Sequence, residues 1–345
     1  MLDDLKYIHE RDAQDSLGIA ERQWRELEHD YHIVNADTLN GKVENIVYAG
    51  MGGSALAGIV SGVWPGYRVP FEVCRDYDIP HYVGPGTLFI AASYSGNTEE
   101  TIAALTTAAE RGAILVVIAS GGKLEQIAAD KNYAFLKLPK ADQPRYAVLY
   151  NLRAIVEAAE HLNVFAVSEA QKELVSVESF LCESVKSWIA TVPTSKNPAK
   201  ELAQELMGLS PVVYSGPFLA PAAYKWKIGL NENAKNVAWW GVYPEFNHNE
   251  FIGWSEKPVD KPYAVIDLRS NLDHPRIQKR FEITERLLSG KRPAPHVVHA
   301  VGKTRLEQLL WTTAFGDFVS IYLGLLNGVN PAPVVLVEKL KKELE

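Results

Sequence analysis

Three hydroxyl side chains gather in one short segment of this sequence, residues 93–98, which read SYSGNT. An apolar run at residues 87–91 precedes the segment, and an alanine-rich pattern at helical spacing follows from residue 101. This pattern predicts a turn between a strand and a helix. The first N–H groups of a helix lack intrahelical partners, and that end of the helix dipole is positive. Ser93, Ser95 and Thr98 could therefore bind a phosphate dianion there, although the same residue types also serve as plain helix caps.

A second loop, upstream of the first, has the composition of a ligand-binding turn. Residues 50–58 read GMGGSALAG and follow an apolar run at residues 43–49. Glycine lets the backbone approach a ligand closely, so Gly53 would leave room for a phosphate and Ser54 would add a hydroxyl. Gly53 and Ser54 therefore join the hydroxyls of the first loop as candidate phosphate ligands.

The glycine loop also fits a different ligand. The spacing Gly50-x-Gly52-x-x-Ala55 matches the dinucleotide-binding fingerprint, and Glu72 follows about 20 residues later at a strand end. An NAD-dependent oxidoreductase is therefore an alternative. Two observations favour a sugar phosphate instead. Roughly 40 residues precede the loop, whereas the fingerprint normally opens the fold, and a nucleotide would leave the SYSGNT turn without a role.

A carboxylate and an imidazole occur later in the chain, each between asparagines. Glu232 lies in the segment LNENAK, and His248 lies in PEFNHNE. Such a pair could transfer protons as acid and base. Taken alone, each residue is as readily explained as a solvated glutamate at a helix end and a structural histidine near a proline turn.

The elements that must position these residues form two cycles of strands and helices. Strands are predicted at 43–49, 68–74, 87–91, 111–120 and 133–138, then again at 211–216, 263–270 and 296–301. Alternating strands and helices predict an α/β fold with parallel sheets flanked by helices. The second cycle resembles the first, so we expect a tandem repeat with domains at 1–152 and 153–345. The second copy lacks the hydroxyl sets, which predicts one phosphate site per chain.

Composition limits the partners. The 345 residues are 47% hydrophobic and 22% charged, with a formal net charge of −7, which argues against nucleic-acid and anionic membrane partners. The two cysteines have no metal or redox spacing, which favours a reducing compartment. The N-terminus is charged, and no apolar run is expected to approach the ~20 residues that span a bilayer. We expect a cytoplasmic protein.

The segments MGGSALAG, SYSGNTEET, LNENAK and PEFNHNE together resemble the bifunctional phosphoglucose/phosphomannose isomerases of the sugar isomerase (SIS) superfamily. The resemblance covers nearly the whole chain and implies two tandem αβα SIS units, each a parallel sheet between helix layers. It also implies metal-free, cofactor-free interconversion of glucose 6-phosphate, and of mannose 6-phosphate, with fructose 6-phosphate through a cis-enediol.

The resemblance also implies roles for single residues. Ser54, Ser93, Ser95 and Thr98 would hold the substrate phosphate. Glu232 would carry the proton between C1 and C2, and His248 would open the sugar ring from the partner subunit of a homodimer. Arg145 would stabilise the enediol, and Lys339, with Lys341 as the nearby alternative, would assist ring opening. The chemistry independently asks for a tuned carboxylate, a fixed cation and a group titrating near neutrality.

One position departs from the family pattern. The C-terminal hinge of the bifunctional enzymes has a threonine where this chain has Ala332. Alanine keeps the space that permits rotation about C2–C3 but lacks the hydroxyl, so the preference between the glucose and mannose epimers stays open. A non-catalytic SIS-type sugar-phosphate sensor is a further alternative, although a sensor would not need both Glu232 and His248.

Overall fold

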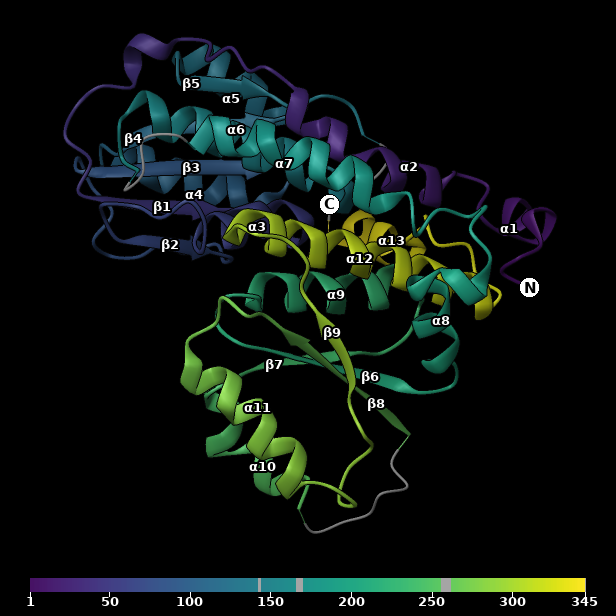
Figure 1. The fold of residues 1–345 in the computed structure, drawn as a ribbon. Helices are drawn as coiled ribbons and strands as arrows, with labels where there is room; N and C mark the ends of the chain where they lie inside the picture. Colours follow the sequence, from purple (N-terminus) through teal and green to yellow (C-terminus); the bar gives the residue numbers. More distant parts are fainter. Residues whose placement is uncertain (142–143, 166–169, 256–261, 345) are drawn as a thin grey trace. The chain divides into compact units, whose positions relative to one another are not determined.

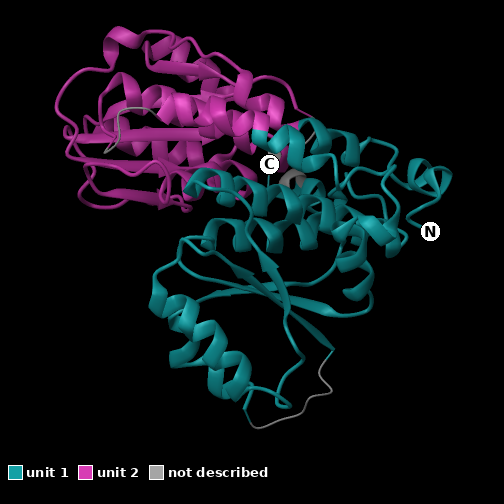
Figure 2. Ribbon diagram, in the orientation of Figure 1, with its two compact units in different colours: residues 1–22, 180–345 teal, residues 23–179 magenta. Residues whose placement is uncertain are grey.

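The computed structural model describes residues 1–141, 144–165, 170–255 and 262–344. The chain divides into two compact units, residues 23–179 and residues 1–22 with 180–345 (Figure 2). Each unit contains a parallel sheet flanked by helices, which confirms the predicted α/β class (Figure 1). The division expected from the repeats, 1–152 and 153–345, follows the chain, whereas compactness groups residues 1–22 with the second repeat and residues 153–179 with the first.

The 23–179 unit is built on a five-stranded sheet in the order β2-β1-β3-β4-β5. Its strands are β1 (Asn45–Ala49), β2 (Phe71–Cys74), β3 (Thr87–Ser93), β4 (Ile114–Ala119) and β5 (Ala134–Lys137). The helices are α3 (Gly52–Ser61), α4 (Glu99–Glu110), α5 (Gly122–Lys131), α6 (Val148–His161) and most of α7 (Ala170–Val185). All neighbouring strands are parallel, and β3 is buried along its whole length. Helices on both faces explain the unbroken apolar runs of these strands.

The unit of residues 1–22 and 180–345 is coloured teal in Figure 2 and is called the second unit because it contains the second repeat; its four-stranded parallel sheet has the order β7-β6-β8-β9. Its strands are β6 (Ser210–Ser215), β7 (Trp239–Val242), β8 (Tyr263–Arg269) and β9 (His296–His299). The helices are α1 (Leu5–Arg11), α2 (Ser16–Arg22), α8 (Pro198–Glu205), α9 (Ala220–Glu232), α10 (Glu250–Gly253), α11 (Pro275–Leu287), α12 (Arg305–Leu326) and α13 (Val335–Leu344). In chain order, β6 to β9 repeat the arrangement of β1 to β4, so the two sheets share one topology over four strands, and β5 extends the first sheet. The short edge strand β7 was not among the predicted strands.

The longest helix, α12, forms the core of this second unit against α9. Trp226 of α9 donates its indole N–H to the carbonyl of Thr312 at 2.8 Å, and Gly316 leaves room for the indole ring. By length and composition alone α12 could cross a membrane, which contradicts the expectation that no apolar segment is long enough. However, 89% of the apolar stretch is buried inside the protein. The hydropathy of α12 is therefore that of a core helix.

Candidate active site

The predicted phosphate loops lie at the carboxyl ends of the strands of the 23–179 sheet. The chain leaves β1 toward β2 on one side and leaves β3 toward β4 on the other, so the sheet order reverses between β1 and β3. In open α/β sheets, ligands bind outside the carboxyl ends of the strands at such a reversal. Helices α3 and α4 both begin there, directly after β1 and β3. Two helix N-termini are therefore directed at the same edge, which favours an anion.

The structure brings the predicted hydroxyls of the two loops together. The Ser93 hydroxyl lies 2.7 Å from that of Thr98 and 3.4 Å from that of Ser95. Ser54 of α3 accepts a hydrogen bond from the Tyr94 N–H at 3.0 Å and so joins the glycine loop to the SYSGNT turn. Thr98 is the N-cap residue of α4, yet its side chain makes no capping hydrogen bond. Capping therefore does not explain this hydroxyl.

Gly96 is required by the shape of the turn. Its φ is +68°, and a Cβ there would lie 1.7 Å from the carbonyl oxygen of Gly121. The Gly96 carbonyl also accepts a hydrogen bond from Leu124 N–H at 2.9 Å. The absence of a side chain at Gly96 therefore lets the loop after β4 pack against the hydroxyl turn. The close approach that glycine permits here is to protein backbone.

Arg145 is buried in the same unit. It lies in the 3-10 turn η3 (Pro144–Tyr146), which packs against α3, the helix that provides Ser54. The side chain is 2% exposed, and its guanidinium lies 4.8 Å from the Tyr146 ring centroid. A side chain so buried is not that of an ordinary surface arginine, which pairs with carboxylates in water. A buried guanidinium stays charged and is a fixed cation for an adjacent anion.

Glu232 ends α9 in the other unit, as the sequence predicted, and is half-buried. The end of the helix is fixed by α12: Asn233 donates to the Ser320 hydroxyl at 2.9 Å. Lys235, which the sequence analysis did not single out, donates to the backbone carbonyls of Glu232 and Pro331, the latter at 3.0 Å. This lysine joins the NENAK segment to the C-terminal hinge.

The C-terminal hinge is ordered by its own asparagine. Asn330 accepts a hydrogen bond from the Ala332 N–H at 3.1 Å and donates to Gln14 at 2.7 Å. Ala332 is 3% exposed. Lys339 lies on the following helix, α13, with an exposed side chain, and the side chain of its alternative Lys341 lies outside the described residues.

His248 lies far from Glu232 within this unit. The segment after Glu232 returns to the start of β6, where Asn236 donates to the Leu209 carbonyl at 2.9 Å. His248 instead follows the end of β7, where Tyr243 N–H donates to Ser215, the last residue of β6. Strand β6 runs from Ser210 to Ser215, and at roughly 3.3 Å per residue its two ends lie about 17 Å apart. The imidazole of one chain therefore does not reach the Glu232 carboxylate of that chain.

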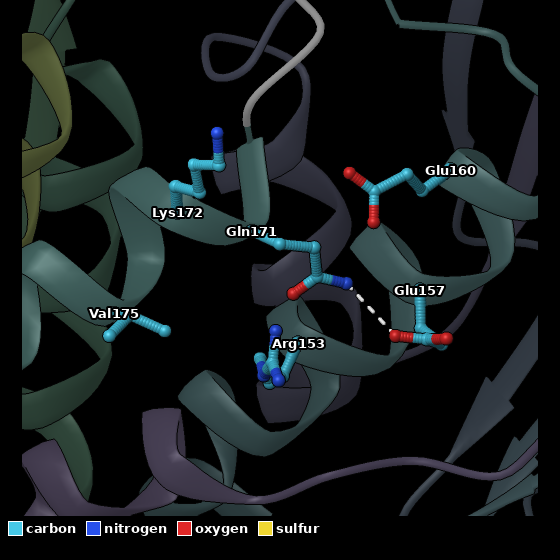
Figure 3. Close-up of a pocket in the computed structure, with 6 residues that line it drawn as sticks. All are labelled: Arg153, Glu157, Glu160, Gln171, Lys172 and Val175. Atoms are coloured by element: carbon cyan, nitrogen blue, oxygen red, sulfur yellow. Dashed lines mark hydrogen bonds between the residues drawn. The ribbon is translucent and has the colours of Figure 1, made fainter.

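A surface pocket opens elsewhere in the 23–179 unit, between α6 and α7 (Figure 3). It is lined by Arg153, Glu157, Glu160, Gln171, Lys172 and Val175, none of them a predicted site residue. Gln171 donates to Glu157 at 2.9 Å, and burial raises the pKa of that carboxyl. Because two cationic and two carboxylate side chains line it, this pocket has no net preference for an anion. The hydroxyl loops remain the better candidate for a phosphate site.

Glu72, the acidic residue expected to accompany the glycine loop in a dinucleotide site, does not stand at the end of its strand. Glu72 lies inside β2, opposite Val47 of β1, and two residues before the strand ends. Its carboxylate accepts a hydrogen bond from the Tyr82 hydroxyl at 2.5 Å. A ribose-binding carboxylate would stand at the strand end and face the helix N-terminus. The dinucleotide alternative is therefore not supported by this geometry.

Comparison with known proteins places the chain. Residues 195–344 match the model of the bacterial phospho-glucose isomerase C-terminal SIS domain. A bifunctional phosphoglucose/phosphomannose isomerase from Caldicellulosiruptor bescii is 35% identical over 323 residues, which cover 91% of this chain and 94% of that protein. A D-glucosamine-6-phosphate 4-epimerase from Sulfolobus acidocaldarius is 34% identical over 256 residues, 73% of this chain and 77% of its own length.

A solved structure agrees with the fold. The crystal structure of a glucose-6-phosphate isomerase like protein from Thermus thermophilus aligns with a TM-score of 0.66 at 21% identity and covers 99% of this chain and 98% of that one. That likeness shows the architecture, and the sequence identity to the curated relatives shows the family. This chain belongs to the bifunctional phosphoglucose/phosphomannose isomerase family of SIS-domain enzymes.

Proposed function

We propose that this protein is an aldose–ketose isomerase that interconverts glucose 6-phosphate, and mannose 6-phosphate, with fructose 6-phosphate. The observation that supports this most is the hydroxyl cluster at the start of α4, in which Ser93 and Thr98 lie 2.7 Å apart and Thr98 does not cap its helix. A phosphate dianion would accept from these hydroxyls and from the free N–H groups of two helices. Anchoring the phosphate places C1 and C2 in a repeatable position.

In this proposal Glu232 removes the proton from C2 of the aldose and returns it to C1, through a cis-enediol. The carboxylate is half-buried at the end of α9. Arg145 supplies positive charge to the oxygen that becomes negative in the enediol, because a guanidinium stays protonated. Lys339 assists ring opening from α13. The small side chain of Ala332 leaves space for rotation about C2–C3, so one base could serve both epimers.

His248 opens the sugar ring as acid and base in this scheme. His248 and Glu232 of one chain lie at opposite ends of strand β6. Each site would therefore need the histidine of a second copy. A homodimer that shares His248 between subunits satisfies this requirement. The acidic chain, its two free cysteines and the burial of α12 favour a cytoplasmic enzyme without nucleic-acid or membrane partners.

The test compares the wild-type protein with Glu232→Gln, which keeps shape and removes the base. Fructose 6-phosphate should form from glucose 6-phosphate in the presence of EDTA. The variant should lose at least about 10³-fold in kcat, while fructose 6-phosphate still binds, because general-base catalysis contributes about 10²–10⁴-fold. Near-normal turnover by the variant would contradict the role of Glu232.

Other outcomes would contradict the activity itself. Tight binding without turnover would show a sensor. Conversion of glucosamine 6-phosphate to its C4 epimer, without fructose 6-phosphate formation, would show an epimerase. Saturable binding of NADH, measured by fluorescence, would revive the oxidoreductase alternative.

A further inference from the structure

Side-chain contacts hold the turn of the second unit that contains His248. His248 is the last residue of the 3-10 turn η5 (Glu245–His248), and its side chain is exposed. The residue before it, Asn247, is half-buried and lies against α11. The residue after it, Asn249, is the N-cap of α10. The two asparagines of the NHN segment are therefore tied to the protein, while the imidazole is exposed.

The amide of Asn247 is fixed from both sides by one helix. Arg280 Nη1 donates to the Asn247 oxygen at 3.0 Å, and the Asn247 amide nitrogen donates to the Thr284 hydroxyl at 3.0 Å. Arg280 and Thr284 lie four residues apart on α11, so both project from the same face of that helix. A guanidinium only donates, and therefore the amide can have only one orientation here.

Asn249 fixes the other side of the turn. Its amide nitrogen donates to Glu245 at 2.7 Å, and its oxygen accepts from the Glu250 N–H at 2.6 Å. Phe246, which precedes the NHN segment, is 2% exposed. The Phe246 ring lies 4.9 Å from that of Tyr243, which in turn lies 4.3 Å from Phe281 of α11. Polar and aromatic contacts thus hold η5 to α11.

We propose that Arg280 and Thr284 are positioning residues for ring opening, which act through Asn247 to hold His248 in the orientation that a sugar ring requires. This inference rests on the proposed role of His248 and extends it to a helix that contributes no group to the reaction. The two asparagines of the NHN segment act in this scheme as supports of the histidine. A misplacement of about 1 Å in a catalytic group can cost up to about 10²-fold in rate.

The test isolates ring opening from isomerisation. In the Glu232→Gln background, the α and β anomers of glucose 6-phosphate should still exchange at the site, and exchange NMR measures that rate. Adding Thr284→Val, which removes the hydroxyl at nearly constant volume, should slow anomerisation about tenfold. Thr284→Ser restores the hydroxyl and should recover the rate to within about twofold. The Kd of fructose 6-phosphate should change little, because His248 is not a phosphate ligand.

A matched control separates positioning from general packing. Thr313 is also a buried threonine of this unit, but its hydroxyl donates to the Leu309 carbonyl of its own helix at 2.8 Å. Thr313→Val should leave anomerisation unchanged. Should Thr284→Val fail to fold, Arg280→Met at a half-buried position tests the same contact and should also slow the exchange.

The outcomes distinguish the two proposals. If His248→Ala in the Glu232→Gln background does not slow anomerisation, the proposed role of His248 fails, and the positioning fails with it. If His248→Ala abolishes catalysed anomerisation while folded Thr284→Val and Arg280→Met variants keep the parent rate, the activity stands and the positioning inference is overturned.

Discussion

The two sheets of this chain share one topology but differ at the edge where a phosphate would bind. In the 23–179 unit, the helices after β1 and β3 begin at Gly52 and Glu99, and the N-cap Thr98 makes no capping bond with its side chain. In the other unit, a proline stands in the first turn of both corresponding helices, Pro221 in α9 and Pro275 in α11. Proline has no N–H, so each removes a possible anion donor.

In the second unit, protein side chains occupy the position that corresponds to the proposed phosphate site of the first. His274 caps α11 by accepting from Arg276 N–H at 3.1 Å. The Asp273 carboxylate lies in the loop after β8 and packs directly on Gly216, the residue after β6. Burial raises the pKa of Asp273 to about 6, and a hydrogen bond from the Phe218 N–H opposes that rise. The first repeat thus leaves the Thr98 hydroxyl at its helix end without a capping role, while the second repeat places prolines, a histidine cap and a buried carboxylate at the corresponding position.

The largest expected effect is on substrate affinity, and it distinguishes the hydroxyl turn after β3 from the loop after β8. Ser93→Ala with Thr98→Ala should raise the KM for glucose 6-phosphate at least about 10²-fold, because each hydrogen bond to a charged group is worth roughly 1.5–3 kcal/mol. Ser270, which follows β8, donates to Gln308 at 2.6 Å, and Ser270→Ala should leave KM within about twofold. Steady-state kinetics of the two variants measures the difference. Equal effects on KM would remove the distinction between the repeats.

A smaller effect concerns the shape of the hydroxyl turn. Gly96→Ala should destabilise the protein by about 2–4 kcal/mol, since it adds a strained positive φ and a clash with the Gly121 carbonyl. Gly290 of the second unit has a similar φ of +73°, but a Cβ there would meet nothing within 4 Å. Gly290→Ala should cost only about 1 kcal/mol. Urea unfolding of both variants compares the costs, and matching midpoints would show that the loop after β4 does not restrict the turn.

The smallest effect concerns Asp273 and depends on pH. A folded-state pKa of about 6, above the unfolded value of 3.8, means that ionised Asp273 costs stability. That cost is fully present above about pH 6 and disappears as the pH falls toward 4. Asp273→Asn should therefore stabilise the protein by about 1–3 kcal/mol at pH 7.5 and by little at pH 4. Thermal melts across this range test it, and a gain that does not vary with pH would contradict the buried-carboxylate account.

Local patterns predicted much of this structure. The apolar runs before SYSGNT and GMGGS became β3 and β1, and Glu232 ends a helix as expected. The edge strand β7 was missed because its four residues, WWGV, are too short and too exposed to show an alternating pattern. The contact between Asn247 and α11 joins residues 33 and 37 positions apart, and no local signal predicts which asparagine lies against that helix.

The length of the apolar stretch in α12 was also misjudged, because its apolar residues surround the whole helix and are interrupted by polar residues that are themselves buried. One of these, Asp317, forms a buried ion pair with Lys225 of α9. Asp273 was missed for a related reason. An aspartate two residues before a proline is an ordinary turn residue in a sequence, and only the fold brings it against Gly216.

In this scheme the sugar phosphate binds in the first repeat only, at the hydroxyl turn and the adjoining glycine loop. A crystal of the Glu232→Gln protein soaked with fructose 6-phosphate tests it most directly. We expect one phosphate per chain, within hydrogen-bond distance of Ser93, Ser95 and Thr98. A phosphate bound instead at the Asp273 loop, or outside both repeats, would contradict it.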